Sequence, residues 1–142
     1  MKTYPNYRVS VEVVVSKDGK ILLAKRADDA KVAPGAWCVP AGKVNYTEIP
    51  VAAAVREAKE ETSLDVSVKA EIACRTATIK NGDEDAYRLI YTYLVEPTDS
   101  EQEVQIDEEH SEFVWVSKEE LVSGKYDSLL PEHLEIFSAH AF

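Results

Sequence analysis

The sequence has few cysteines, only Cys38 and Cys74. Their spacing matches no zinc or redox motif, so we expect neither a disulfide nor a metal–thiolate site. The sequence also has no hydrophobic run approaching the ~18 residues that a membrane span needs. Residues 1–4 lead into no apolar signal segment. We therefore expect a cytoplasmic protein without a membrane partner.

Positive charge is in the minority. The chain has 16 Lys and Arg residues against 26 Asp and Glu residues, which gives a formal net charge of −10. Such a charge repels the phosphate backbone of nucleic acids, so polymeric DNA or RNA is not an expected partner. A small phosphorylated substrate is compatible with this charge if a divalent metal neutralises the carboxylates locally. Clustered carboxylates are therefore the feature to look for.

Internal repeats, low-complexity segments and linker-like stretches are also lacking. With 142 residues, 45% of them hydrophobic, the chain has the size and composition of one globular domain over residues 1–142. Strands are predicted where β-branched and aromatic residues gather: 7–16, 21–25, 37–39, 65–80, 86–96 and 113–116. Helices are predicted over 50–62, 118–122 and 131–140. Turn signals at Asp18-Gly19 and Asn81-Gly82-Asp83 predict two hairpins, so we expect a mixed sheet packed by helices.

The helix at 50–62 carries an unusual set of charges. Its helical period predicts an apolar stripe that faces the core: Val51, Ala54, Val55 and Ala58. Glu57, Glu60 and Glu61 share a neighbouring stripe in the C-terminal half, where their mutual repulsion and the helix dipole both disfavour anions. A hard divalent cation would reverse both effects. The helix alone is equally compatible with a solvated acidic face near Arg56 and Lys59.

A longer pattern surrounds this helix. Gly42 is followed by five residues, Glu48, seven residues, Arg56-Glu57, Ala58, one residue, Glu60-Glu61, one residue, Ser63 and Leu64. This pattern resembles the Nudix box, which has glycine where Ser63 stands, and every other fixed position matches. The flanking segments 21–26, 37–43 and 108–116 are also similar to the family. The resemblance implies the α/β/α sandwich of that family, with a mixed β-sheet.

The resemblance also implies roles for the box residues. Glu57, Glu60 and Glu61 would bind Mg²⁺, with Mn²⁺ as an alternative, assisted by the backbone carbonyl of Gly42. Arg56 would orient the glutamates, and Glu48 would support the loop and Arg56. The candidates for the general base are Glu57, Glu60, Glu108 and Glu109. We favour Glu109 as an additional metal ligand or base, although it could equally be a solvated member of the acidic run Asp107-Glu108-Glu109.

Substrate contacts are less defined. Arg26, Lys43 and Arg88 are candidates for binding phosphates, and their alternative is an ordinary place on the surface. Trp37, Tyr87 and Tyr91 are candidates for stacking on a base, and their alternative is core packing. His110, His133 and His140 have no metal-ligand spacing and receive no role.

The function that the resemblance implies is Mg²⁺-dependent hydrolysis of a phosphoanhydride bond in a nucleoside diphosphate-linked substrate. A nucleoside triphosphate, standard or modified, is favoured, because no subgroup motif is present downstream: Thr78 and Ile79 stand where the ADP-ribose group carries proline. Two alternatives are a non-catalytic Nudix-fold domain that binds a nucleotide sugar and an acidic protein-interaction domain. A homodimer is common in the family and is compatible with this sequence.

Ser63 is the one departure from the box. It follows the helix at the position where a left-handed residue commonly ends a helix. Glycine adopts that conformation freely, whereas serine would be strained there by roughly 1 kcal/mol. We therefore expect Ser63 to lower stability slightly and to leave the metal ligands unchanged.

Overall fold

The structure, a computed structural model, describes residues 6–81 and 84–142. Its elements are β1 (Tyr7–Lys17), β2 (Lys20–Arg26), β3 (Trp37–Cys38), β4 (Ala41–Lys43), α1 (Pro50–Thr62), β5 (Val66–Asn81), β6 (Glu84–Pro97), β7 (His110–Val116), α2 (Lys118–Val122) and α3 (Pro131–His140). The strands form one seven-stranded sheet with the order β3-β2-β1-β6-β5, in which β4 also pairs with β1 and β7 with β2. Strands β1 and β6 are parallel and the other pairs are antiparallel. The predicted mixed sheet is confirmed.

The three helices begin and end where the sequence predicts. Pro50 and Pro131 occupy the first turns of α1 and α3, where a missing N–H is harmless, and Ser117 forms a capping box with Glu120 at α2. The turn at Asp18 and Gly19 has positive φ at both residues, as a two-residue hairpin requires. At the second hairpin, Gly82 and Asp83 lie outside the described residues.

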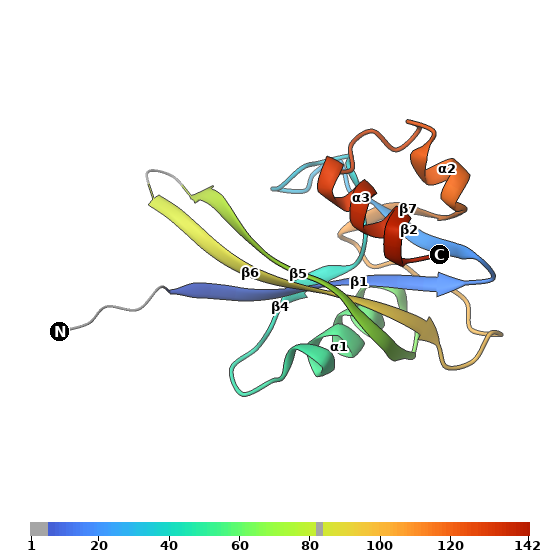
Figure 1. The fold of residues 1–142 in the computed structure, drawn as a ribbon, viewed down its shortest axis with the longest axis horizontal. Coiled ribbons are helices and arrows are strands. Elements are labelled where there is room, and N and C mark those ends of the chain that lie inside the picture. Colours follow the sequence, from blue (N-terminus) through green and yellow to red (C-terminus); the bar gives the residue numbers. More distant parts are fainter. Residues whose placement is uncertain (1–5, 82–83) are drawn as a thin grey trace.

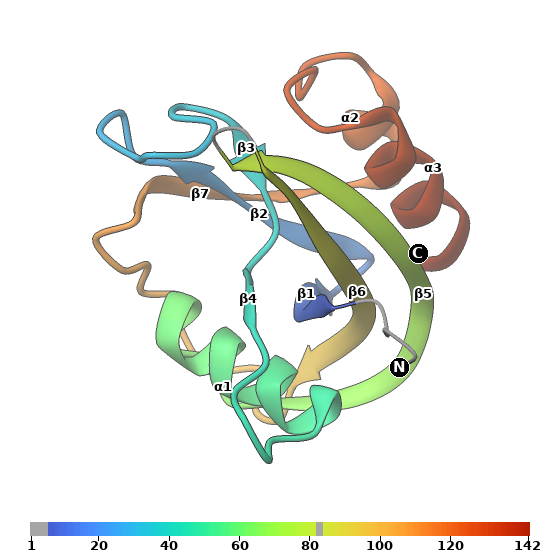
Figure 2. The ribbon, with the colours of Figure 1, turned by 90° about the vertical axis from the view of Figure 1, so that its left-hand side faces the viewer.

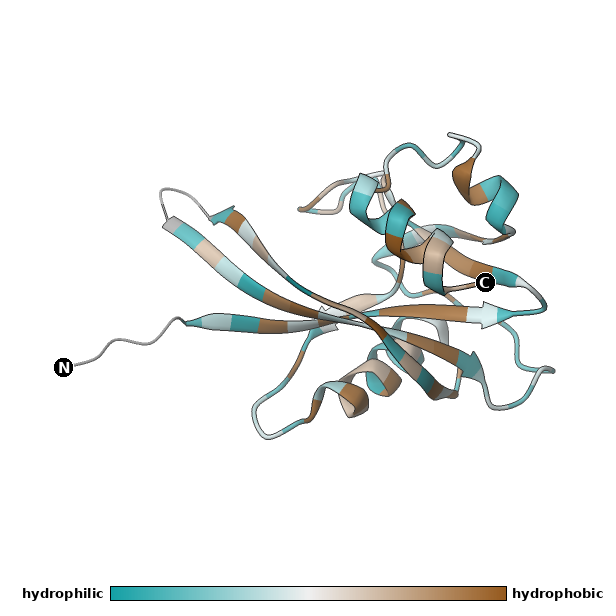
Figure 3. Ribbon diagram, viewed as in Figure 1, coloured by the Kyte–Doolittle hydropathy of each residue, from teal (hydrophilic) through white to brown (hydrophobic). Residues whose placement is uncertain are grey.

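Helices cover the two faces of the sheet. Helix α1 lies on one side of the strands and the α2–α3 pair on the other (Figures 1 and 2). Strand β1 runs between them, so its side chains are buried on both faces: Val11, Val13 and Val15 pack with α1, and Val14 packs with α3. Figure 3 shows the hydrophobic residues of β1 concentrated where it passes between the helices. No helix of the described segments is long and apolar enough to cross a membrane.

Two expectations about local structure are wrong. Residues 41–43 form the short strand β4 next to β1, although the sequence predicts a strand only over 37–39 in this region. The buried face of α1 also differs from the predicted stripe, because Val51 and Val55 are 42% and 37% exposed. The buried residues are Ala53, Ala54, Glu57, Ala58, Glu61 and Thr62. The helix is thus turned so that two of its glutamates face β4.

Candidate active site

Five carboxylates converge on one hollow beside β4. The hollow has a volume of about 380 Å³. It is lined by Ala41, Gly42, Lys43, Asn45, Arg56, Glu57, Glu60, Glu61, Asp107 and Glu109. Three of the carboxylates come from α1 and two from the segment that precedes β7. The box residues predicted to share a site are therefore brought together, with Asp107 and Glu109 beside them.

The α1 carboxylates differ in their surroundings. Glu61 is 7% exposed and accepts a hydrogen bond from the Ala41 amide at 2.8 Å. Burial raises the pKa of the Glu61 carboxyl to about 8, and the neighbouring charge of Glu57 adds to this rise. Glu57 is 8% exposed, and burial raises its pKa despite a hydrogen bond from Arg56. Glu60 has an exposed side chain at the rim. Burial of an unpaired carboxylate costs free energy, so a cation bound beside Glu57 and Glu61 would stabilise their ionised forms.

Arg56 connects the box residues to one another. Its guanidinium donates from Nε and Nη2 to the two oxygens of Glu48, each at 2.8 Å. It also donates to Glu57 at 2.9 Å, to Glu60 at 3.3 Å and to the Lys43 carbonyl at 2.9 Å. The hydrogen bond from Arg56 lowers the pKa of Glu48 to about 2. Because every edge of the guanidinium is engaged, it fixes β4, the following loop and α1 in one arrangement.

Gly42 lets the backbone of β4 approach α1 closely. A Cβ atom at this position would overlap the carboxylate of Glu57. The backbone of β4 therefore lies directly against the buried glutamates, and their donor atoms are hard oxygens. This donor set, together with five carboxyls that outnumber the cations Lys43 and Arg56 of the hollow, fits a divalent cation such as Mg²⁺ or Mn²⁺.

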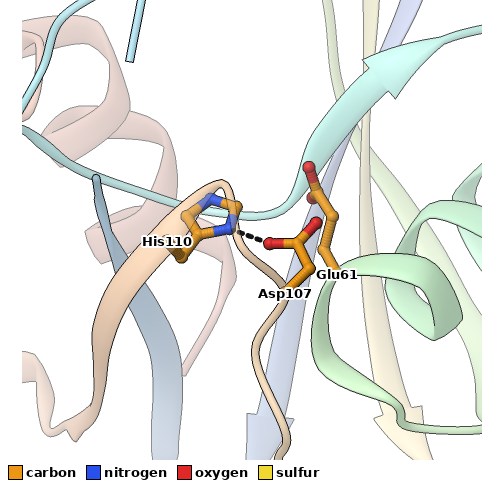
Figure 4. Close-up of side chains that lie close together, drawn as sticks. All are labelled: Glu61, Asp107 and His110. Atoms are coloured by element: carbon orange, nitrogen blue, oxygen red, sulfur yellow. Dashed lines mark hydrogen bonds and ion pairs between the residues drawn. The ribbon is translucent and has the colours of Figure 1, made fainter. Parts of the chain in front are cut away.

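Two site residues were not predicted as such. One possible donor atom each of Glu61, Asp107 and His110 lies within 4.8 Å of those of the other two. Figure 4 shows Asp107 between the other two, with its Oδ1 hydrogen-bonded to Nδ1 of His110 at 2.7 Å. The sequence assigns His110 no role, but a turn from Asp107 to His110 at the start of β7 brings its ring next to the Asp107 carboxylate. No sequence spacing distinguishes Asp107 from the exposed Glu108, which does not line the hollow.

The candidate substrate residues are dispersed. Lys43 is exposed at the rim of the hollow, whereas Arg26, Trp37 and Arg88 lie outside its lining. Trp37 packs edge-on against Tyr126, with the two ring centroids 5.3 Å apart. The Nε atom of Arg88 is buried without a hydrogen-bond partner.

The two candidate tyrosines line a different hollow. Tyr87 and Tyr91 contribute to a space of about 850 Å³ near the start of β1. Asn45 lines this space and the carboxylate hollow alike, so the two are neighbours.

Comparison with known proteins agrees with this geometry. The model of the NUDIX domain matches residues 6–139. The chain belongs to the Nudix family. The nucleoside triphosphatase NudI of Escherichia coli (strain K12) is 33% identical over 122 residues, which cover 81% of this chain and 85% of that relative. This Nudix chain is accordingly a pyrophosphohydrolase that acts on acid anhydrides, as the box implies.

Solved structures share the fold. A MutT protein from Methanosarcina mazei Go1 superposes with a TM-score of 0.74 at 22% identity, over 97% of this chain and 95% of that one. An Ap4A hydrolase of C. elegans superposes with a TM-score of 0.67 at 20% identity, over 93% and 96%. The α/β/α arrangement of this Nudix chain is therefore that of the family.

Proposed function

We propose that this Nudix hydrolase uses Mg²⁺ to cleave a phosphoanhydride bond in a nucleoside diphosphate-linked substrate, with a nucleoside triphosphate favoured. The observation that carries the proposal is the convergence of Glu57, Glu60, Glu61, Asp107 and Glu109 on one hollow. Such a set repels itself and any phosphate unless a divalent cation is present. The similarity to a protein described as a nucleoside triphosphatase supports the favoured substrate. A binding domain without catalysis is less well supported, since all box carboxylates are present and the three on α1 line the hollow.

The residues divide the chemistry between them. Glu57, Glu60, Glu61 and Asp107 would hold the cation, which when bound would neutralise phosphate charge and acidify a water molecule. Arg56 keeps Glu57 and Glu48 in place. Glu109 lines the hollow and is exposed, so it can accept a proton from the attacking water. Lys43 at the rim would contact the outer phosphates.

The face of the sheet opposite α1 carries buried polar groups that would contact the rest of the substrate. Within the described residues, the buried side-chain atoms without a hydrogen-bond partner belong to Ser10, Arg75 and Arg88. These residues surround Ile90, because Ser10 and Arg75 are its register partners on β1 and β5. Buried donors without acceptors favour an acceptor-rich ligand, such as the carbonyl groups of a base. Glu12 on this face is the register partner of Ala41, which lines the hollow.

A nucleotide panel tests the proposal. The chain is incubated with Mg²⁺ and each nucleoside triphosphate or diphosphate derivative, and the products are identified. We expect turnover of at least one triphosphate that stops in excess EDTA and falls by at least ~10²-fold in Glu60→Gln. Undiminished hydrolysis in EDTA would overturn the metal requirement. Metal-dependent binding of a nucleotide without any turnover would instead support the binding-domain alternative.

A further inference from the structure

His110 is buried behind the carboxylate hollow, and its two ring nitrogens have different partners. The His110 side chain is only 4% exposed, and Asp107 is partly exposed. Nδ1 lies 2.7 Å from Oδ1 of Asp107, and Nε2 lies 3.7 Å from Sγ of Cys38. The second oxygen of Asp107 lies on the side of Glu61 (Figure 4). Of the described residues that line the hollow, Asp107 is thus the one hydrogen-bonded to the imidazole.

The hydrogen between His110 and Asp107 can be placed. An ionised carboxylate only accepts hydrogen bonds, so Nδ1 at this distance carries the hydrogen and donates it. A ring nitrogen that carries a hydrogen has no lone pair for a metal. Nε2 faces the Cys38 thiol and not the hollow. In this arrangement His110 is not itself a ligand, although its nitrogen lies near the donor atoms of Glu61 and Asp107.

The backbone around Asp107 is held independently of this contact. The Gln105 amide donates to the Thr62 carbonyl at 2.9 Å, and the Ala27 amide donates to the Glu109 carbonyl at 2.9 Å. The Asp107 side chain, by contrast, is repelled by the carboxylates around it, among them Glu61. A donor on its outer side is what fixes its direction.

We infer that His110 is a positioning residue, which donates from Nδ1 to Asp107 and thereby directs that carboxylate to the divalent cation beside Glu61. This inference rests on the proposed metal-dependent function. It assigns Asp107 as an oxygen ligand outside the box. Groups that orient a ligand from behind typically change metal affinity 10–100-fold when they are removed.

A matched pair of variants isolates the donor. His110→Asn places an amide N–H where Nδ1 stands, and His110→Leu has nearly the same shape without a donor. Both lose the contact with Cys38 alike. Mn²⁺ is titrated into the metal-free chain by calorimetry, with unbound Mn²⁺ followed by electron paramagnetic resonance. We expect His110→Leu to weaken Mn²⁺ binding about tenfold or more, and His110→Asn to stay within about threefold of the wild type.

Asp107→Asn completes the test. It should weaken Mn²⁺ binding at least as much as His110→Leu, and the double variant should be no weaker than Asp107→Asn alone, since both changes act through one contact. The inference is wrong if His110→Leu binds Mn²⁺ like the wild type, if His110→Asn is as weak as His110→Leu, or if the two losses add. It is also wrong if the wild-type chain binds no Mn²⁺.

Two further outcomes are separable. If His110→Leu does not fold, judged by circular dichroism, His110→Gln replaces it, because its amide reaches the Nε2 position and leaves Asp107 without a donor. If the wild-type chain binds Mn²⁺ in a His110-dependent way but cleaves no nucleotide, the inference stands and the proposed function fails. If the wild-type chain cleaves nucleotides with metal and His110→Leu binds Mn²⁺ normally, the proposed function stands and the inference about His110 is wrong.

Discussion

Ser63 ends α1 with a left-handed backbone, φ 66° and ψ 10°. The expectation of that conformation is confirmed, but the structure adds a hydrogen bond from Ser63 Oγ to the Gln105 carbonyl at 3.0 Å. The backbone strain of a non-glycine residue and this hydrogen bond are each worth about 1 kcal/mol and have opposite signs. The stability gain first expected for glycine is therefore offset.

Replacement of Ser63 separates the two effects. Ser63→Gly relieves strain and loses the hydrogen bond, so we expect a free energy of unfolding close to wild type. Ser63→Ala keeps the strain and loses the bond, so it should be less stable than Ser63→Gly by about 1 kcal/mol. Urea unfolding measures both. An alanine variant as stable as the glycine variant would show that the left-handed backbone carries no strain here.

Glu61 makes the stability of the metal-free protein depend on pH. Its pKa is about 8 when folded and near 4.5 otherwise, so the folded state binds its proton more tightly. The stability that this proton contributes is complete below pH 4.5 and is lost as pH rises to about 8.

We therefore expect wild-type protein in EDTA to lose more stability than Glu61→Gln between pH 5 and pH 8. Urea unfolding of both at the two pH values isolates this group, since the other titrating groups are common to both. Equal losses in the two proteins would contradict a raised pKa at Glu61.

At the scale of elements, Arg56 joins α1 to β4 and to the loop that carries Glu48 through a planar fork of donors. Lysine keeps the charge but cannot reproduce that fork. We expect Arg56→Lys to lower kcat/KM at least ~10-fold, because Glu57 loses its partner. Lys59→Arg, on the exposed side of the same helix, is the matched control and should have little effect. Steady-state kinetics with an identified substrate measure both variants. A kcat/KM of Arg56→Lys within twofold of wild type would show that the planar donors of the guanidinium are not required.

The polar face of β1 and β6 carries a second prediction. Arg88 has a buried Nε without a partner, whereas its register neighbour Arg8 is exposed. Arg88→Met should raise KM at least ~10-fold, because the substrate would lose its contact with Nε. It should cost little stability, because Nε has no hydrogen-bond partner in the protein that the change would leave unpaired. Arg8→Met should change KM less than threefold. Equal effects of the two variants would mean that general positive charge, and not a specific contact, matters on this face.

At the scale of the whole molecule, the divalent cation should act on stability as well as on catalysis. A ligand that binds only the folded state raises the apparent stability, and here it also relieves repulsion among the carboxylates of the hollow. We expect millimolar Mg²⁺ to raise Tm by several degrees over EDTA. The triple variant of Glu57, Glu60 and Glu61 to Gln should show no such rise. Thermal unfolding followed by circular dichroism checks both, and an equal rise in the triple variant would indicate binding elsewhere.

Local signals explain what could be predicted of the fold. Proline in the first turn, a capping box and β-branched runs act within a few residues, so the helix boundaries and the long hairpins could be predicted from the sequence. Strand β4 has three residues and exists because it pairs with β1, which is a tertiary effect. The rotation of α1 likewise depends on its neighbours, since the buried Glu61 accepts a hydrogen bond from the Ala41 amide of β4 and the carboxylate of Glu57 lies against Gly42.

The same distinction applies to the site. Box spacing predicted which α1 residues share the hollow, because spacing on a helix fixes which side chains are neighbours. The direction of Asp107, Glu108 and Glu109 is set by a turn and by hydrogen bonds to Thr62 and Ala27. Nothing in the order of these residues encodes it, and for that reason His110 received no role from the sequence.

The carboxylates of the hollow come from two segments that are separated in the chain by the whole of β5 and β6. A cation held by Glu61 and Asp107 would therefore act as a reversible cross-link that closes the long hairpin between them, as a disulfide closes a covalent loop. While the cation is bound, the two ends of this loop stay joined, so β5 and β6 gain less entropy when they open. Their amide protons should exchange with deuterium more slowly in Mg²⁺ than in EDTA, so that the kinetic lifetime of the hairpin follows the occupancy of the site.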